Sequence, residues 1–213
     1  MAAIQFTDRR SVESLALARA ASAAMSAPAT VDGRPWRWRI DGPLLSLFAE
    51  DTLGAVTVSC GIVLHHARIA LAADGVAADV RYLPDPARSD LLATIGHTGP
   101  ARPGTAEVRL YRAIAARHSD TRPISAAPVP EAVLDRVLAA ARRPGVTVRT
   151  RDARLSVHPT DDRPELLLGA GEATSAILLA ANVEGLATEL GPGPGGAGAT
   201  VRIGVPAAGP RIR

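Results

Sequence analysis

The feature of this sequence that most constrains its fold is an internal repeat with a constant offset of 110 residues. Segments 60–80 and 170–190 share one layout: a run of small and apolar residues, a glycine, and a short apolar stretch. This layout predicts a helix that ends at Gly75 or Gly185 and is followed by a strand. Gly61 and Gly171 occupy the same position in the two helices. We interpret the repeat as a duplicated half-unit; the alternative is a coincidence between two alanine-rich helices.

Hydrophobic periodicity and turn residues predict the remaining elements. Helices are predicted over 11–25, 57–73, 105–117, 131–141 and 164–184, with a short helix over 89–95. Strands are predicted over 36–40, 44–48, 76–83 and 201–205, and 146–157 is predicted to be a hairpin or a long strand. The segment 96–104 is the predicted linker, and the glycine-rich segment 191–198 is expected to be disordered without a partner.

Both tryptophans of the chain lie in one predicted strand, in the stretch RPWRWRI. Alternation along a strand places Trp36 and Trp38 on one face and Arg37 and Arg39 on the other. We expect the tryptophans to point inward. Alternating aromatic and arginine side chains also suit single-stranded nucleic acid, but here stacking and phosphate contacts would fall on opposite faces of the sheet.

Composition indicates a folded protein with a proper core, because 47% of the 213 residues are apolar and 21% are charged. The sequence pI of about 9.9 suggests a nucleic-acid partner. However, the net charge is only +3, and all 24 basic residues are arginine. Arginine without lysine is typical of a GC-rich coding bias, and a nucleic-acid partner is therefore not expected.

The expected location is the cytoplasm. The first residues lack the basic-then-apolar order of a signal peptide. The run 62–73 is the most apolar, but His65, His66 and Arg68 interrupt it, and no membrane span is expected. The single cysteine, Cys60, excludes an internal disulfide and is interpreted as a small buried residue rather than a nucleophile.

The motif RHSDTRPI follows a predicted helix and is the best candidate for ligand binding. Arg117, His118, Ser119 and Arg122 offer cationic groups and a hydroxyl, which suit a phosphate. The alternative is a solvated helix C-terminus, where basic residues are favourable in any case. No metal-ligand spacing and no nucleotide-binding glycine loop is present, and no metal is expected.

Several segments resemble the nitroreductase superfamily, in particular its Acg-like branch. The segment 27–38 (APATVDGRPWRW) resembles the family pattern A-P-S-x-x-N-x-Q-P-W, and 113–130 resembles A-I-x-x-R-R-T-D-R-R-P-F-x-x-x-P-V-P. The segment 59–86 is similar to the central helix and following strand of the branch, and 167–189 and 201–206 are similar to the second central helix and last strand. The resemblance covers most of residues 11–206.

The resemblance implies an α/β (α+β) fold with a central mixed sheet flanked by helices. It implies two pseudo-repeated half-units in one chain, over 11–95 and a shortened one over 105–206. It also implies an FMN-dependent oxidoreductase that takes hydride from NAD(P)H and reduces a nitro, quinone or similar acceptor. Because the flavin carries this chemistry, no catalytic side chain is required of the chain.

The resemblance also assigns the flavin-binding positions. The phosphate is assigned to the RHSDTRPI motif and to Arg211, and the flavin edge to the segment that precedes the tryptophans. The cofactor-binding residues expected on this basis are Arg117, His118, Ser119, Arg122, Pro28, Ala29, Asp32, Arg34 and Arg211.

The chain departs from the family pattern at the flavin edge. Ala29, Asp32 and Arg34 replace the family serine, asparagine and glutamine, and His118 replaces an arginine. The alternative function is therefore a degenerate family member that binds or sequesters flavin without turnover. Because the double unit is shortened, part of its apolar interface is expected to be exposed, which predicts a homodimer.

Overall fold

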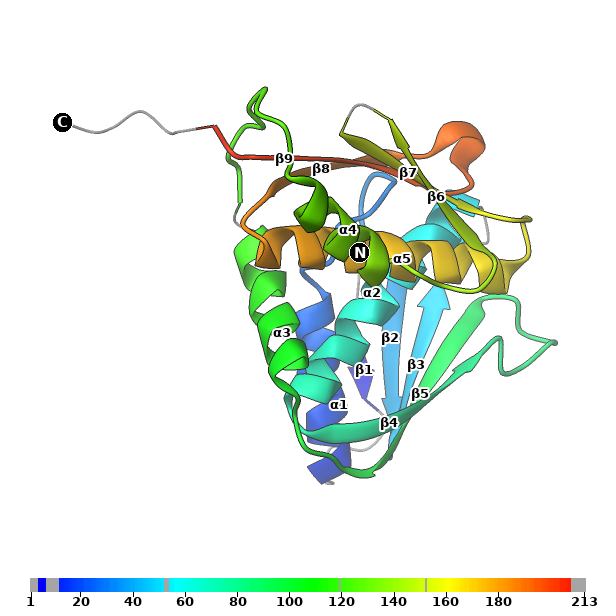
Figure 1. Cartoon of the computed structure of the whole chain (residues 1–213). Coiled ribbons are helices and arrows are strands. Elements are labelled where there is room, and N and C mark those ends of the chain that lie inside the picture. The colour runs from blue at the N-terminus through cyan, green and yellow to red at the C-terminus, as the bar shows by residue number, and fades with distance from the viewer. Residues whose placement is uncertain (1–3, 7–11, 52–53, 119, 152, 208–213) are drawn as a thin grey trace.

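The computed structural model describes residues 4–6, 12–51, 54–118, 120–151 and 153–207. Two long helices, α2 (Gly54–Ala73) and α5 (Pro164–Val183), cross at the centre of the molecule (Figure 1). Each packs against its own β-sheet, and the two sheets lie on different sides of the crossing. The hydrophobic core therefore has two main clusters, one for each helix and its sheet.

The first sheet has the strand order β1-β2-β3-β5-β4. Its neighbouring strands are antiparallel, except that β1 is parallel to β2. The strands are β1 (Ile4–Phe6), β2 (Trp36–Asp41), β3 (Leu44–Ala49), β4 (Val76–Tyr82) and β5 (Leu91–Pro100). Helix α1 (Val12–Ala24) packs with α2 on one face of this sheet.

The second sheet is antiparallel and has the order β6-β7-β9-β8. Its strands are β6 (Val146–Arg151), β7 (Arg154–Pro159), β8 (Ala187–Pro192) and β9 (Ala199–Gly204). The chain order α4 (Glu131–Ala140), β6, β7, α5, β8, β9 repeats the order α1, β2, β3, α2, β4, β5. The sheet order is repeated as well, and the predicted duplication is confirmed. Helix α3 (Thr105–His118) connects the halves.

The α+β class with two repeated half-units is therefore confirmed, but the single central sheet is not. The structure has two sheets, and α2 and α5 take the central position between them. The division of the chain at 11–95 and 105–206 stays a prediction.

Two equivalent glycines form the crossing of α2 and α5. A Cβ atom on Gly61 would lie 2.9 Å from Cα of Gly171 and would collide with the carbonyl oxygen of Leu168. Conversely, a Cβ on Gly171 would lie 2.7 Å from Cα of Gly61 and would collide with the carbonyl of Val58. The repeat is thus a pseudo-twofold arrangement in which each half makes the same backbone contact with the other.

The tryptophan strand has the orientation expected from its alternation. Trp36 and Trp38 are fully buried, whereas Arg37 and Arg39 are only partly buried. Arg37 Nη2 donates to Asp90 Oδ2 at 3.0 Å, and its guanidinium lies 4.1 Å from the centre of the Phe48 ring. The tryptophans therefore build the core and are not available to stack on bases.

Two sequence predictions near β5 are wrong. Residues 89–95 form no helix, because β5 begins at Leu91 and Leu91–Ile95 are buried between β3 and β4. A short run with apolar residues on both faces has no period that separates a strand from a helix. The linker predicted over 96–104 also overlaps β5, which continues to Pro100 through pairing with β4.

The segment 191–198 is ordered within the fold, which corrects the expectation of disorder. It contains the end of β8 and a short 3-10 helix, η1 (Pro194–Gly196), before β9 begins. The N–H of Gly193 donates to the carbonyl of Gly198 at 3.2 Å. A Cβ on Gly193 would lie only 2.7 Å from the carbonyl carbon of Gly198, so glycine here permits close backbone approach.

Judged by length and composition alone, α2 and α5 are long and apolar enough to cross a membrane, and each has a mean hydropathy of 1.5. This corrects the expectation that no segment qualifies. In both helices most of the apolar window is buried, 78% in α2 and 72% in α5. Their apolar composition is explained by their place in the core.

Candidate functional site

The predicted phosphate-binding motif begins at the C-terminal end of α3, beside the loop that follows α1. Arg117 Nη2 donates to the carbonyl oxygen of Ser26 at 3.1 Å. This contact brings the motif next to the segment 27–38, as the resemblance implies. Burial lowers the pKa of Arg117. Its Nε is buried and has no hydrogen-bond partner within the described part of the chain.

A second unpartnered nitrogen lies on α2. Nε2 of the fully buried His66 has no hydrogen-bond partner among the residues that the structure describes. His66 Nδ1 lies 3.0 Å from the carbonyl of Ile62, which can only accept. Nδ1 therefore carries the proton, and Nε2 is an acceptor. The positive charge of Arg117 contributes to the lowered pKa of His66, behind burial as the main cause. An unpaired donor and an unpaired acceptor are buried in one region.

A cavity of about 510 Å³ lies between α1 and α3. Ser22 and Ser26 line it from α1 and the loop after it, and Tyr111, Arg112 and His118 line it from α3. The lining of this cavity therefore includes hydroxyl groups, a cation and an imidazole. Of the predicted site residues in the described ranges, His118 lines this cavity directly, and Arg117 is its neighbour in sequence.

Arg122 is engaged by a carboxylate of its own loop. Its Nε and Nη2 donate to Oδ1 and Oδ2 of Asp120, each at 2.8 Å. Hydrogen bonds from Arg122 are the main cause of a lowered pKa of the Asp120 carboxyl. A phosphate at Arg122 would therefore have to compete with Asp120. Ser119 and Arg211 lie outside the described residues, and their assignment stays a prediction.

The predicted flavin-edge segment is anchored to the start of α2. The N–H of Thr30 donates to Ser59 Oγ at 3.0 Å, and its hydroxyl donates to the carbonyl of Ala55 at 3.0 Å. Ala29 packs against the first core cluster, and Pro28 is partly buried.

The two charged residues of this segment, Asp32 and Arg34, are exposed. Pro28, Ala29, Asp32 and Arg34 are not among the residues that line the α1–α3 cavity. The structure thus holds this segment near Arg117 without bringing its charges to the cavity.

A buried charge cluster joins the two half-units, and the sequence alone did not identify it. Arg68 Nη1 donates to Glu172 Oε1 at 2.6 Å, and the Tyr82 hydroxyl lies 3.2 Å from both carboxylate oxygens. Arg143 Nε lies 3.7 Å from Glu172 Oε2. The side chain of Glu172 is only 4% exposed. The feature of the sequence that could have indicated this cluster is Glu172 itself, an acidic residue in the middle of the largely apolar helix α5.

Replacing Glu172 by glutamine removes the charge that Arg68 and Arg143 share and preserves the side-chain shape. We expect Glu172→Gln to lower the free energy of unfolding by about 1–2 kcal/mol, a low value for a buried pair because Arg68 is 39% exposed. Urea denaturation measures this loss. The matched control is Glu189→Gln, which breaks the exposed pair with Arg202 and should change the stability by less than about 0.5 kcal/mol. Equal effects of the two changes would contradict a specific role for the cluster.

Histidine and serine meet at equivalent positions of the two central helices. His65 Nδ1 and His66 Nδ1 lie 2.8 Å and 3.0 Å from Ser175 Oγ. The Ser175 hydroxyl therefore lies within hydrogen-bond distance of one ring nitrogen of each histidine. Burial is the main cause of the lowered pKa of both histidines, and that of His66 is about 3. Both rings are therefore neutral structural groups at neutral pH.

Cys60 is fully buried, and burial raises its pKa, so its thiol is not an activated nucleophile. Across the described ranges, no three His, Cys, Asp or Glu side chains converge on a common point.

The comparisons with known proteins agree with the fold. No model of a protein family matches the sequence. The chain is 38% identical over 135 residues to Rv3131 of Mycobacterium tuberculosis H37Rv, named as a candidate NAD(P)H nitroreductase; the match covers 59% of this chain and 39% of that protein. It is 33% identical over 153 residues to Acg of the same strain, which is also named as a candidate NAD(P)H nitroreductase. This match covers 67% of this chain and 44% of Acg.

A solved structure described as a candidate nitroreductase of Thermotoga maritima superposes with a TM-score of 0.54 and 13% sequence identity, covering 94% of this chain and 88% of that one. This likeness shows the fold alone. The chain is thus a nitroreductase-like α+β protein. Its sequence similarity to Rv3131 and Acg confirms the resemblance to the Acg-like branch of the nitroreductase superfamily. The chain spans less than half the length of these two relatives.

Proposed function

We propose that this chain is an FMN-binding, nitroreductase-like oxidoreductase. The observation that carries the proposal is the buried, unpartnered Nε of Arg117 at the segment that resembles the phosphate-binding motif of the family. An anion that reaches this N–H would satisfy it, and the adjoining cavity offers His118, Ser22 and Ser26 as further hydrogen-bonding groups. The residues present therefore fit the phosphate part of FMN.

When bound, FMN supplies the two-electron transfer from NAD(P)H to a nitro, quinone or similar acceptor. The chain's own residues would bind FMN and orient it. Arg117 and His118 would hold the phosphate, and the loop anchored by Thr30 would cover the flavin edge. Homodimer formation, an acceptor of small molecular size and a cytoplasmic location belong to the same proposal.

Arg117 is the residue whose replacement most directly tests the site. Because Arg117→Gln removes the cationic donor, we expect the dissociation constant for FMN to rise at least about tenfold, the loss of a charged hydrogen bond. Fluorescence quenching of FMN on titration with protein measures it. The matched control is Arg109→Gln, an exposed arginine on the same helix, which should leave the affinity unchanged. If the two variants bind FMN equally well, the phosphate assignment is wrong.

A second candidate is a flavin-binding protein without turnover. The observations that favour it are the engagement of Arg122 by Asp120 and the exposure of Asp32 and Arg34, which leave few polar groups for the flavin ring. The visible spectrum separates the candidates. Flavin bands that NADPH bleaches without oxygen support the oxidoreductase, and bound flavin that NADPH does not bleach supports the second candidate. A protein that stays colourless with added FMN contradicts both.

A further inference from the structure

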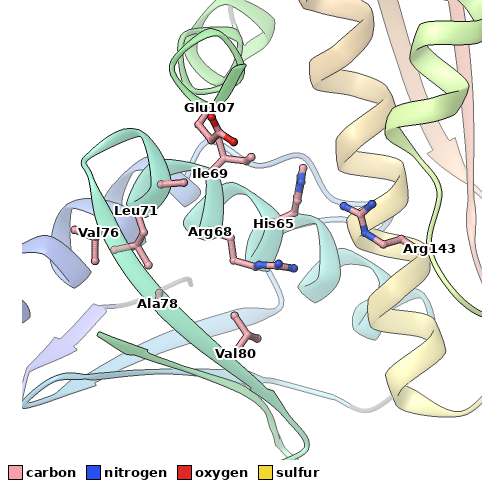
Figure 2. Close-up of a pocket in the computed structure, with 10 residues that line it drawn as sticks. His65, Arg68, Ile69, Leu71, Val76, Ala78, Val80, Glu107 and Arg143 are labelled. Carbon is pink, nitrogen blue, oxygen red and sulfur yellow. The ribbon is translucent and has the colours of Figure 1, made fainter. Parts of the chain in front are cut away.

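A second cavity, of about 260 Å³, lies between α2, β4 and the first turn of α3 (Figure 2). It shares no lining residue with the α1–α3 cavity beside His118. The guanidinium of Arg68 lies in the middle of the view, and His65 and Arg143 approach it from α2 and from the loop after α4. The two half-units thus contribute one arginine each.

The polar side of this cavity holds two guanidinium groups, those of Arg68 and Arg143. Among the described residues, Arg68 and Arg143 form ion pairs with one shared carboxylate, Glu172, at 2.6 Å and 3.7 Å. His65 is neutral and adds no charge. Glu107 lines the cavity from α3, but its carboxylate turns back to the helix start, where a Cβ on Gly104 would collide with it. Two guanidinium groups therefore share one buried counter-charge.

Both arginines retain donors that Glu172 does not use. Arg68 contacts the carboxylate through Nη1, which leaves Nε and Nη2. Arg143 directs Nη1 to the carbonyls of Ala140 and Arg142, which leaves Nη2. The side chains of Arg68 and Arg143 are 39% and 28% exposed, and both line the cavity. A planar anion can therefore accept hydrogen bonds from both arginines without displacing Glu172.

Much of the remaining lining is apolar. It includes Val76 and Val80 from β4 and Leu71 and Ile69 from α2, all labelled in Figure 2. A ligand that fills the cavity must therefore have an apolar body and one anionic end, and its size is bounded by the volume of about 260 Å³.

We propose that this cavity binds a small organic carboxylate, with its carboxylate between Arg68 and Arg143 and its apolar part along β4. The site is independent of the proposed flavin site. Planar carboxylate geometry matches the guanidinium fork, and the apolar wall disfavours an inorganic anion.

Benzoate and benzamide are matched probes, because they have the same shape and differ in charge. Isothermal titration calorimetry with the full chain should show benzoate binding at least about tenfold more tightly than benzamide, the difference that charge-assisted hydrogen bonds provide. Arg143→Gln should weaken benzoate binding at least about tenfold. The control Arg81→Gln removes the same charge from the other face of β4, where Arg81 is 79% exposed, and should leave binding unchanged.

Several results would overturn the proposal. These are no binding of benzoate, equal binding of benzoate and benzamide, and equal effects of Arg143→Gln and Arg81→Gln. Displacement of benzoate by FMN would also overturn it, because the cavity would then belong to the flavin site. If Arg143→Gln does not fold, Ala78→Phe at the exposed edge of the cavity provides a second test. It should abolish benzoate binding and leave FMN binding unaffected, which separates this proposal from the proposed function.

Discussion

Gly61→Ala is expected to lower the free energy of unfolding by about 3 kcal/mol or more, at the upper end of the cost of overpacking. The added Cβ would collide with the carbonyl of Leu168 and would lie 2.9 Å from Cα of Gly171. These are backbone atoms of a long helix, and no side-chain rotation relieves the clash. Helices α2 and α5 must separate, which loosens packing in both core clusters. Urea denaturation followed by circular dichroism measures the loss.

Gly169→Ala is the matched control for this change. Gly169 lies on α5 near the crossing, but an added Cβ meets only Cγ2 of Val146, at 3.5 Å, an ordinary contact. We expect a stability gain of up to about 1 kcal/mol, because alanine is the better helix former. Gly61→Ala and Gly171→Ala together should cost less than the sum of the two single changes, since one separation of the helices relieves both clashes. Additive losses would contradict a shared crossing.

Acid should destabilise the protein strongly between pH 6.5 and pH 5. Burial lowers the pKa of His65 and His66 in the folded state. Below pH 6.5 the unfolded chain therefore binds protons at these histidines that the folded chain does not bind. The stabilising contribution is therefore complete above about pH 6.5 and is lost as the pH falls toward the folded pKa, about 3 for His66. By pH 5 the expected loss is about 2 kcal/mol for His66, and His65 adds a loss of the same sign.

The double variant His65→Asn with His66→Asn tests the origin of this loss. The asparagine amide can occupy the position of Nδ1 and cannot titrate. Urea midpoints measured at each pH should depend less on pH in this variant than in the unchanged chain. His97→Asn, at a partly exposed position in β5, is the control and should retain the full dependence. An identical pH dependence in all three proteins would show that the two buried histidines are not responsible.

The elements with a clear hydrophobic periodicity or repeat could be predicted from the sequence. Alternation correctly oriented Trp36 and Trp38, and the repeat correctly identified α2 and α5 as equivalent helices. In each case, a local pattern contained the required information.

The charge cluster and β5 could not be predicted, for a physical reason. Arg68 and Glu172 are separated by 104 residues, and their contact depends on the rotation of α2 against α5. All of Leu91–Ile95 is buried, including Thr94, and burial on both faces removes the alternation that identifies a strand. Likewise, the pairing of Arg122 with Asp120 depends on the loop conformation rather than on spacing.

The crossing of α2 and α5 has a consequence for synthesis of the chain. His65 and Ser175 are 110 residues apart. The face of α2 that packs against α5 therefore has no partner until the ribosome has added that length of chain. At typical elongation rates of 5–20 residues per second, this takes roughly 5–20 s. During that interval the nascent first half-unit exposes the surface that α5 later covers, which makes it a natural client for a chaperone that binds apolar helices.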